Sequence, residues 1–242
     1  IEVNPRSSRT IPFISKVTRI PMVKIATKVM SGISIKELGY KDGLYPNKNL
    51  VAVKAPVFSM SKLSGVDSFL GPEMKSTGEV MGIDSNFTGA MKKALISSGL
   101  NVNPGSPILL SIANPDKTDS ENLIKILHKN GHKLYATQGT AKMIRKLGIE
   151  VETVEKRLSN SVGENVVDII ENETVSAVIN TVTGDRQTLQ DGFHIRRAAT
   201  LKKIPCFTSI DTALCAIQSE DLSSSPNERK YNIKSIAKYL EC

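Results

Sequence analysis

Residues 1–6, IEVNPR, place three chemically different side chains at every second position. If this segment ends a β-strand, Glu2, Asn4 and Arg6 project from one face, because strand side chains alternate. Carboxylate and amide oxygens are hard ligands for Mg²⁺, and a planar guanidinium suits a phosphoryl group. The pattern therefore predicts metal binding by Glu2 and Asn4 and phosphate binding by Arg6. The alternative is an exposed edge strand whose charges face solvent.

A second candidate site lies in the sequence ATQGTA, residues 136–141, between an expected strand and an expected helix. Thr137, Gly139 and Thr140 form its polar turn. The N-terminus of a helix offers free backbone N–H groups and the positive end of the helix dipole, which together suit a phosphate. Taken alone, such a turn is as often only a helix cap.

Other polar residues follow the neighbouring expected strands. They are Ser111, Lys117, Lys156, Asn180, Thr181 and Thr183. Each alone is more often a cap or a solvated charge, but the carboxyl ends of parallel strands meet at one edge of a sheet. As a convergent set they predict a site for a nucleotide monophosphate, with Asn180 and Asp191 available to bond the sugar or the base.

The elements that position these residues follow from the spacing of apolar side chains. The sequence predicts helices at 21–30 and 85–98 and a strand at 50–56, which we expect to pair with residues 1–6. A polar joint containing Pro and Gly follows at 100–106, so we place a domain boundary there, dividing the chain into residues 1–100 and 101–242.

After this joint, expected strands and helices alternate. The strands are 108–113, 133–136, 149–154, 177–181 and 206–208; the helices between them lie near 123–127, 143–147, 166–170 and 195–201, and a last short helix spans 231–240. This alternation predicts the α/β class, with a mostly parallel sheet covered by helices on both faces.

Three segments resemble the C-terminal quarter of the large subunit of carbamoyl phosphate synthetase: EVNPRSSRTIPFISK (2–16), GPEMKSTGEVMG (71–82) and VINTVTGDRQTLQDGFHIRR (178–197). The similarity covers essentially the whole chain. It implies that residues 1–100 are the C-terminal part of an ATP-grasp domain and that residues 101–242 form a methylglyoxal-synthase-like regulatory domain. The absence of an initiator Met also suggests a fragment of a longer polypeptide.

The resemblance implies a function for the full-length protein. It would be a ligase that makes carbamoyl phosphate from bicarbonate, glutamine-derived ammonia and two ATP, for pyrimidine and arginine synthesis. The isolated fragment is expected to be inactive. A glutaminase small subunit is the implied partner, a homo-oligomer is left open, and the implied location is cytoplasmic.

The resemblance also assigns roles to residues. Glu2 and Asn4 would ligate Mg²⁺ or Mn²⁺, and Arg6 would steady the phosphate of ATP. The pocket for UMP or IMP as effector would comprise Ser111, Lys117, Thr137, Thr140, Lys156, Asn180 and Thr181. The segment between Asn180 and Asp191 is one residue longer than in enteric members, so base contacts from Val182, Thr183 or Asp185 stay open.

Ala52 stands where ornithine-regulated members carry a carboxylate, so ornithine control is not expected. Glu73 and Glu79 resemble an acid/base pair, but we expect structural roles for both. The three histidines, His128, His132 and His194, show no metal or triad spacing, and we expect them to pack or to lie on the surface.

The composition limits the classes of ligand and partner that the protein can have. A formal charge of +8 and a pI near 9.3 favour anionic ligands. Aromatic residues make up only 5% and the basic residues are dispersed, so we expect no nucleic-acid partner. No apolar run of 18 residues appears, which argues against a membrane segment. The cysteines, at 206, 215 and 242, lack metal-ligand spacing and favour a reduced compartment.

A competing interpretation is a methylglyoxal-synthase-like lyase that acts on a triose phosphate, because that enzyme shares the later domain. Asp185 would be its proton-transferring residue. The Gly-rich, Asp-containing loop and the histidine that such an enzyme requires are not evident in the sequence.

Overall fold

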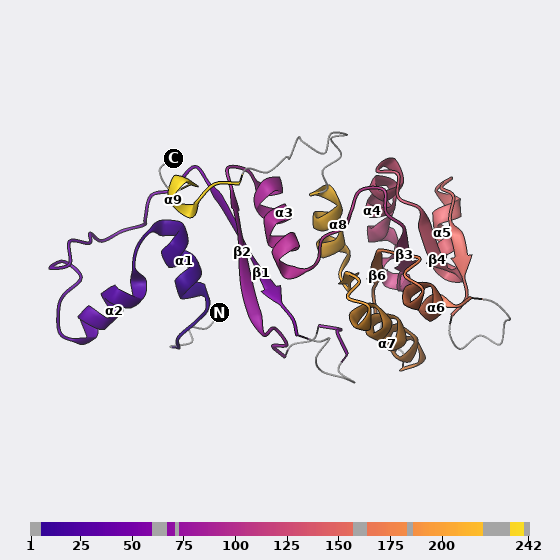
Figure 1. Ribbon diagram of the computed structural model, residues 1–242, viewed down its shortest axis with the longest axis horizontal. Helices are drawn as coiled ribbons and strands as arrows, with labels where there is room; N and C mark the ends of the chain where they lie inside the picture. The colour runs from indigo at the N-terminus through magenta and orange to yellow at the C-terminus, as the bar shows by residue number, and fades with distance from the viewer. Residues whose placement is uncertain are drawn as a thin grey trace.

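The computed structural model describes residues 6–59, 67–70, 73–156, 164–182, 186–219 and 233–239, with only the backbone given for 186–189. Its strands form a two-stranded sheet, β1-β2, and a five-stranded sheet, β5-β4-β3-β6-β7. Figure 1 shows an elongated molecule in which the first helices lie at one end and the five-stranded sheet lies at the other.

The N-terminal part contains α1 (Thr10–Thr18), α2 (Met22–Met30), β1 (Val51–Val57), β2 (Gly78–Asp84) and α3 (Phe87–Ser98). The strand expected at 50–56 is present as β1, and its partner among the described residues is β2, in antiparallel register. Residues 1–5 lie outside the described residues. Helix α3 sits directly on β2, because a Cβ added to Gly82 would lie 1.9 Å from the carbonyl oxygen of Ala90.

The five-stranded sheet is entirely parallel. Its strands are β3 (Ile108–Ser111), β4 (Leu134–Thr137), β5 (Glu152–Val154), β6 (Ala177–Asn180) and β7 (Cys206–Phe207). The helices around it are α4 (Lys117–Lys129), α5 (Gln138–Lys146), α6 (Val166–Glu171), α7 (Arg186–Leu201) and α8 (Ile210–Gln218). The predicted α/β class with a parallel sheet is therefore confirmed.

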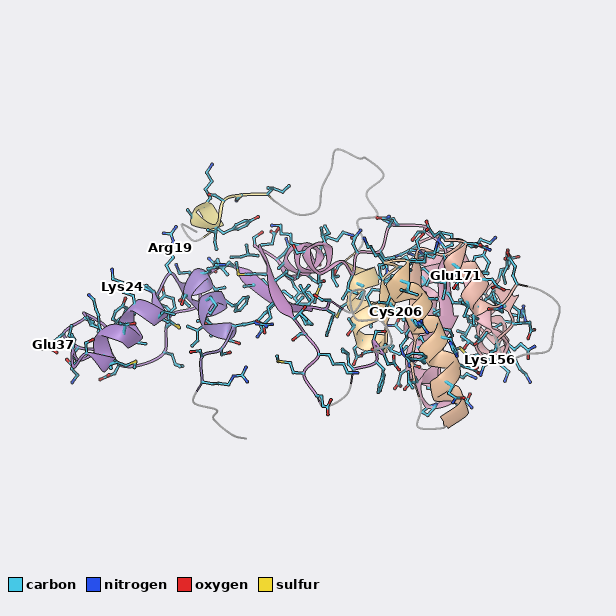
Figure 2. All side chains as sticks on the ribbon, turned by 60° about the horizontal axis from the view of Figure 1, so that its bottom comes forward. Arg19, Lys24, Glu37, Lys156, Glu171 and Cys206 are labelled. Carbon is cyan, nitrogen blue, oxygen red and sulfur yellow. The ribbon has the colours of Figure 1, made fainter. Side chains whose placement is uncertain are left out.

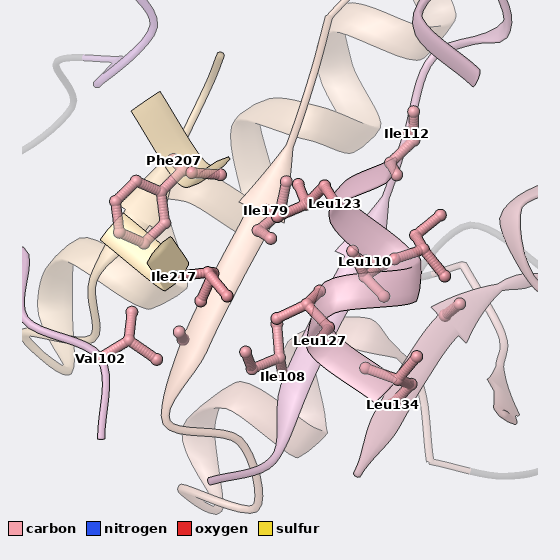
Figure 3. Close-up of a cluster of buried hydrophobic side chains, with 14 of the residues drawn as sticks. Val102, Ile108, Leu110, Ile112, Leu123, Leu127, Leu134, Ile179, Phe207 and Ile217 are labelled. Atoms are coloured by element: carbon pink, nitrogen blue, oxygen red, sulfur yellow. The ribbon is translucent and has the colours of Figure 1, made fainter. Parts of the chain in front are cut away.

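Helices cover both faces of this sheet. Ile108 and Leu110 of β3 pack with apolar residues of α4, α5 and α8 on one face (Figure 3), whereas Leu109 packs with α6 and α7 on the other. All three side chains are fully buried. Because burying one such side chain contributes about 1.5–3 kcal/mol, the two cores fix β3 firmly at the centre of the sheet.

The strand order creates a topological switch point next to β3. The chain continues from β3 to β4 on one side and later adds β6 on the other side. In open parallel sheets ligands bind at the carboxyl ends of the strands beside such a point. The residues that follow β3, β4 and β6 are therefore the place to look for a ligand site.

The last described helix, α9 (Ile236–Tyr239), contacts the N-terminal part. The Lys93 ammonium donates to the Tyr239 hydroxyl at 2.6 Å and lies 2.7 Å from the fully buried carboxylate of Asp84. Arg19 donates to the carbonyl of Ala237 at 2.7 Å. The C-terminal segment thus returns to residues before the proposed boundary, and the division at 100–106 stays a prediction.

Several elements differ from the sequence prediction. Helices α1 and α8 and strand β2 were missed, and α7 begins at Arg186 rather than near 195. Strand β3 ends at Ser111, two residues earlier than expected, because the backbone beyond it bonds to neighbouring side chains. Among the described helices, none combines the length and apolar character needed to cross a membrane.

Candidate functional site

The backbone that leaves β3 is held from both sides by threonine hydroxyls. The Thr140 hydroxyl accepts the N–H of Ile112 at 3.0 Å, and the Thr181 hydroxyl accepts the N–H of Ala113 at 2.9 Å. Both threonines are buried. The structure thus places both threonines at the carboxyl edge of the parallel sheet, which we call the rim. Their hydroxyls already accept hydrogen bonds from the backbone that follows Ser111.

The first turn of α5 has no side-chain cap. Thr137 is its N-cap residue, but the side chain makes no capping bond and instead donates to Thr140 Oγ1 at 3.4 Å. Lys117 of α4 lies beside this turn, because a Cβ on Gly139 would be 3.3 Å from its ammonium nitrogen. A cation therefore stands next to the positive end of a helix, and an anion between them would be attracted by both.

A salt bridge links the residues after β5 to helix α7. The Lys156 ammonium, at the end of the described stretch after β5, lies 3.2 Å from Asp191 Oδ2 in α7. The Lys156 side chain is 49% exposed, whereas that of Asp191 is 12% exposed. The other Asp191 oxygen, Oδ1, is buried without a hydrogen-bond partner among the described residues. A buried acceptor of this kind is costly unless a donor reaches it, so it suits a hydroxyl or amide of a ligand.

Asn180 ends β6 at the switch point and is buried. Its Nδ2 donates to the carbonyl of Ser111 at 3.3 Å, and its Oδ1 accepts from Nη1 of Arg196 at 2.7 Å. These two bonds fix the plane and the orientation of the amide. Asn180 is thus at the predicted place, between the loop after β3 and an arginine that sequence reasoning did not single out.

Arg196 of α7 is fully buried and bound to the N-terminal part of the chain. Its Nε lies 2.6 Å from Asp67 Oδ1 and its Nη2 lies 2.5 Å from Asp67 Oδ2, a bidentate pair. Burial acts to raise the pKa of Asp67. The hydrogen bonds from Arg196 and from the Phe69 N–H outweigh that effect, so the pKa falls below its usual value.

Cys206 of β7 lies near this pair. Residue Cys206 retains some exposed surface, but its thiol lies inside the protein, and burial raises the pKa of the thiol to about 12, with a smaller opposing influence from Arg196. The thiol is therefore protonated at neutral pH and is not a nucleophile. Figure 2 shows Cys206 between Lys156 and Glu171 at one end of the molecule and Lys24 and Glu37 at the other.

The remaining predicted residues lie elsewhere. Arg6 is exposed just before α1 in the N-terminal part, apart from the strand ends. Glu2, Asn4 and Thr183 lie outside the described residues. Within the described part of the chain, no cluster of three or more His, Cys, Asp or Glu side chains could hold a metal ion. Metal binding by Glu2 and Asn4 stays a prediction.

A groove of about 640 Å³ lies at the opposite, amino-terminal edge of the sheet. Lys133 and Glu152 line it and pair with each other at 2.7 Å, and Arg145 bonds to Thr153 at 2.6 Å. The lining cations are thus matched by acidic or polar partners. The carboxyl edge, where Lys117 lies beside the uncapped N-terminus of α5, is therefore the better candidate for an anion site.

Residues 119–208 match the family model of the MGS-like domain. The chain contains an MGS-like domain. A carbamoyl phosphate synthase large chain from Thermomicrobium roseum is 50% identical over 219 residues, which are 90% of this chain and 20% of that relative. The resemblance found in the sequence is thus confirmed: the chain is homologous to the C-terminal region of carbamoyl phosphate synthase large chains, and it spans about a fifth of the length of this relative.

The MGS-like match covers most of the rim but not all of it. Thr137, Thr140, Lys156, Asn180, Thr181 and Asp191 fall inside it, together with Arg196. Ser111 and Lys117 precede it, and Asp67 lies well before it. Arg196 belongs to the quoted segment 178–197, but no spacing rule connects it with a carboxylate 129 positions earlier.

Proposed function

We propose that this chain is the C-terminal part of a carbamoyl phosphate synthase large chain and that its MGS-like domain binds a nucleotide monophosphate effector, UMP before IMP. The homology supports the first statement. The full-length protein would be the ligase that makes carbamoyl phosphate with ATP and Mg²⁺ or Mn²⁺, fed with ammonia by a glutaminase small subunit.

The observation that carries the effector site is the placement of Lys117 beside the first turn of α5. Its ammonium lies beside a helix N-terminus that has no side-chain cap, and Gly139 has no side chain to occupy the space next to it. Charge-assisted bonds of this kind contribute about 1.5–3 kcal/mol each when well ordered. We assign the phosphate of the effector to this turn.

Lys156 and Asp191 explain why a nucleotide suits the site better than phosphate alone. A phosphate would compete with Asp191 for Lys156, and because the ammonium is about half exposed, water and the phosphate can replace the ion pair that is lost. Asp191 would then be left with two acceptor oxygens, which the hydroxyls of a ribose satisfy. Asn180, fixed in orientation by its neighbours, offers its amide to the sugar or the base.

A lyase activity receives less support from the site. Asp185 lies outside the described residues, and His132 bonds to the carbonyl of Ser106 at 2.7 Å, at the amino-terminal edge of the sheet. Two carboxylates described at this edge already have partners: Asp191 pairs with Lys156, and Glu155 accepts from the Gln138 amide at 2.7 Å. An effector site therefore fits these residues better than a proton-transfer site.

Calorimetry with UMP, IMP and uridine tests the proposal. We expect UMP to bind, uridine to bind far more weakly because it lacks the phosphate, and Lys117→Ala to lower UMP affinity about tenfold or more. Lys125→Ala is the matched control, because Lys125 lies on the same helix and pairs only with the exposed Glu121 among the described residues, at 3.9 Å. Equal UMP affinity in both variants would place the phosphate elsewhere.

The N-terminal part carries a separate prediction. The matched residues make up only 20% of the relative, so we expect the isolated 242 residues not to make carbamoyl phosphate. Arg6, Glu2 and Asn4 would contribute to catalysis only within the longer protein. ATP-dependent formation of carbamoyl phosphate by the purified chain would refute this.

A further inference from the structure

Arg196 connects two parts of the chain that are remote in sequence. Its guanidinium makes two bonds to Asp67, in the segment between β1 and β2, and one bond to Asn180 at the end of β6. The guanidinium also lies over the ring of Phe69, with 5.8 Å between the central carbon and the ring centroid. One buried cation thus holds the N-terminal part and the effector rim at once.

The segment around Asp67 is itself held in place. Its carboxylate accepts the Phe69 N–H at 3.0 Å, and the Lys75 ammonium donates to the carbonyls of Asp67 and Phe69 at 3.2 and 2.7 Å. Lys75 stands three residues before β2, and the N–H of Thr77 bonds to the carbonyl of Val57 in β1 at 2.8 Å. A displacement of Asp67 would therefore reach the β1-β2 sheet through a few short contacts.

The other end of Arg196 is equally constrained. A Cβ added to Gly192 would lie 2.5 Å from Nη1 of Arg196 and 3.2 Å from Oδ1 of Asn180. Because Gly192 has no side chain, Arg196 and Asn180 can meet in the space beside it. Gly192 directly follows Asp191 in the chain. Because a guanidinium only donates, its partner atom on Asn180 is the amide oxygen, and Nδ2 is turned toward the Ser111 carbonyl, with one N–H left for a ligand.

We propose that the Asp67–Arg196 ion pair positions Asn180 for the effector and couples effector binding to the N-terminal part of the chain. This inference rests on the proposed effector site. Asp67 and Arg196 are positioning residues, because they act through Asn180. Coupling between binding and a remote contact is reciprocal: a contact of Asp67 that strengthens effector binding is itself strengthened by the effector.

Hydrogen exchange of the purified chain with and without UMP tests the coupling. In the wild type, we expect UMP to slow amide exchange in peptides that cover residues 67–84, although these residues precede the effector rim. In Asp67→Asn, which keeps an acceptor oxygen but loses the charge, this protection disappears and UMP affinity falls about tenfold. Glu79→Gln is the matched control, because Glu79 pairs with Lys54 at 3.4 Å in the same sheet without touching Arg196.

The outcomes separate the two proposals. If UMP does not bind the wild type, the effector site is wrong. If UMP binds but exchange in residues 67–84 does not change, the coupling is overturned even when Asp67→Asn fails to fold, because the wild type alone decides. If Asp67→Asn is folded and retains wild-type affinity and protection, the coupling is overturned as well.

Discussion

The Thr140 hydroxyl accepts the backbone N–H of Ile112 at 3.0 Å, which ties the start of α5 to the end of β3. Thr140→Val keeps the shape of the side chain but leaves that buried N–H without a partner. We expect unfolding by urea to show a loss of about 1–3 kcal/mol, the cost of an unsatisfied buried donor. The change in the free energy of UMP binding should be smaller than the change in the free energy of unfolding.

Thr140→Ser is the control for this prediction, because it restores the acceptor and removes one methyl group. Its stability should lie much closer to that of the wild type. Equal stability of the Val variant and the wild type would show that Ile112 finds another acceptor. A large loss of UMP affinity in a Val variant of normal stability would instead indicate that the Thr140 hydroxyl binds the phosphate, as the sequence predicts.

Asp191→Asn separates recognition of the phosphate from recognition of the sugar. Without the carboxylate, Lys156 loses the negative charge at 3.2 Å that competes with phosphate, so inorganic phosphate should bind about two- to fivefold more tightly, as for a partly exposed ion pair. UMP should bind about tenfold more weakly, because a charged acceptor for a hydroxyl is lost. Calorimetry with both ligands measures the two changes, and Glu171→Gln, an exposed carboxylate at the end of α6, serves as control. Parallel changes for phosphate and UMP would contradict the role of Asp191.

The Asp67–Arg196 pair predicts a pH dependence of stability. Because the folded pKa of Asp67 lies below the unfolded value of about 3.9, the pair contributes stability that is present above the unfolded pKa and lost as the pH falls through the folded pKa. Asp67→Asn has no such proton to bind. The difference in unfolding free energy between wild type and variant should therefore be largest near neutral pH and shrink as the solution becomes more acidic. A difference that is constant with pH would contradict this account.

The sequence identified the strand-end residues because the signal is local. Thr137 and Asn180 are the last residues of two buried strands, Lys156 lies two residues after β5, and parallel pairing brings these positions to one edge. The sequence could not show which hydrogen-bond partners the side chains at this edge have. Thr140 and Thr181 look like ligands for phosphate, yet each bonds to a backbone N–H of the neighbouring loop, because the chain beyond β3 leaves the ladder and needs acceptors.

The elements and contacts that were missed lack such a local signal. Strand β2 carries glycines and acidic residues that disfavour a strand, and it is stabilised by its pairing with β1 and by the cover of α3. Helix α1 contains Pro12 in its first turn, where proline is tolerated but breaks the usual pattern. Asp67 and Arg196 are joined only in the fold, because 129 positions separate them.

The hydroxyl of Tyr239 offers a test of the C-terminal contact. It accepts from Lys93 at 2.6 Å, and the Tyr239 side chain is buried beside β2. Tyr239→Phe retains the ring that faces the ammonium, at 4.6 Å from its centroid, and removes only the hydroxyl. Because Lys93 keeps Asp84 and the Ile83 carbonyl as partners, we expect a loss of about 0.5–1.5 kcal/mol in urea unfolding. Tyr239→Ala should cost more, since it also exposes the covered part of β2 and removes the cation–π contact. Equal stability of the Ala and Phe variants would show that α9 contributes no packing to the N-terminal part.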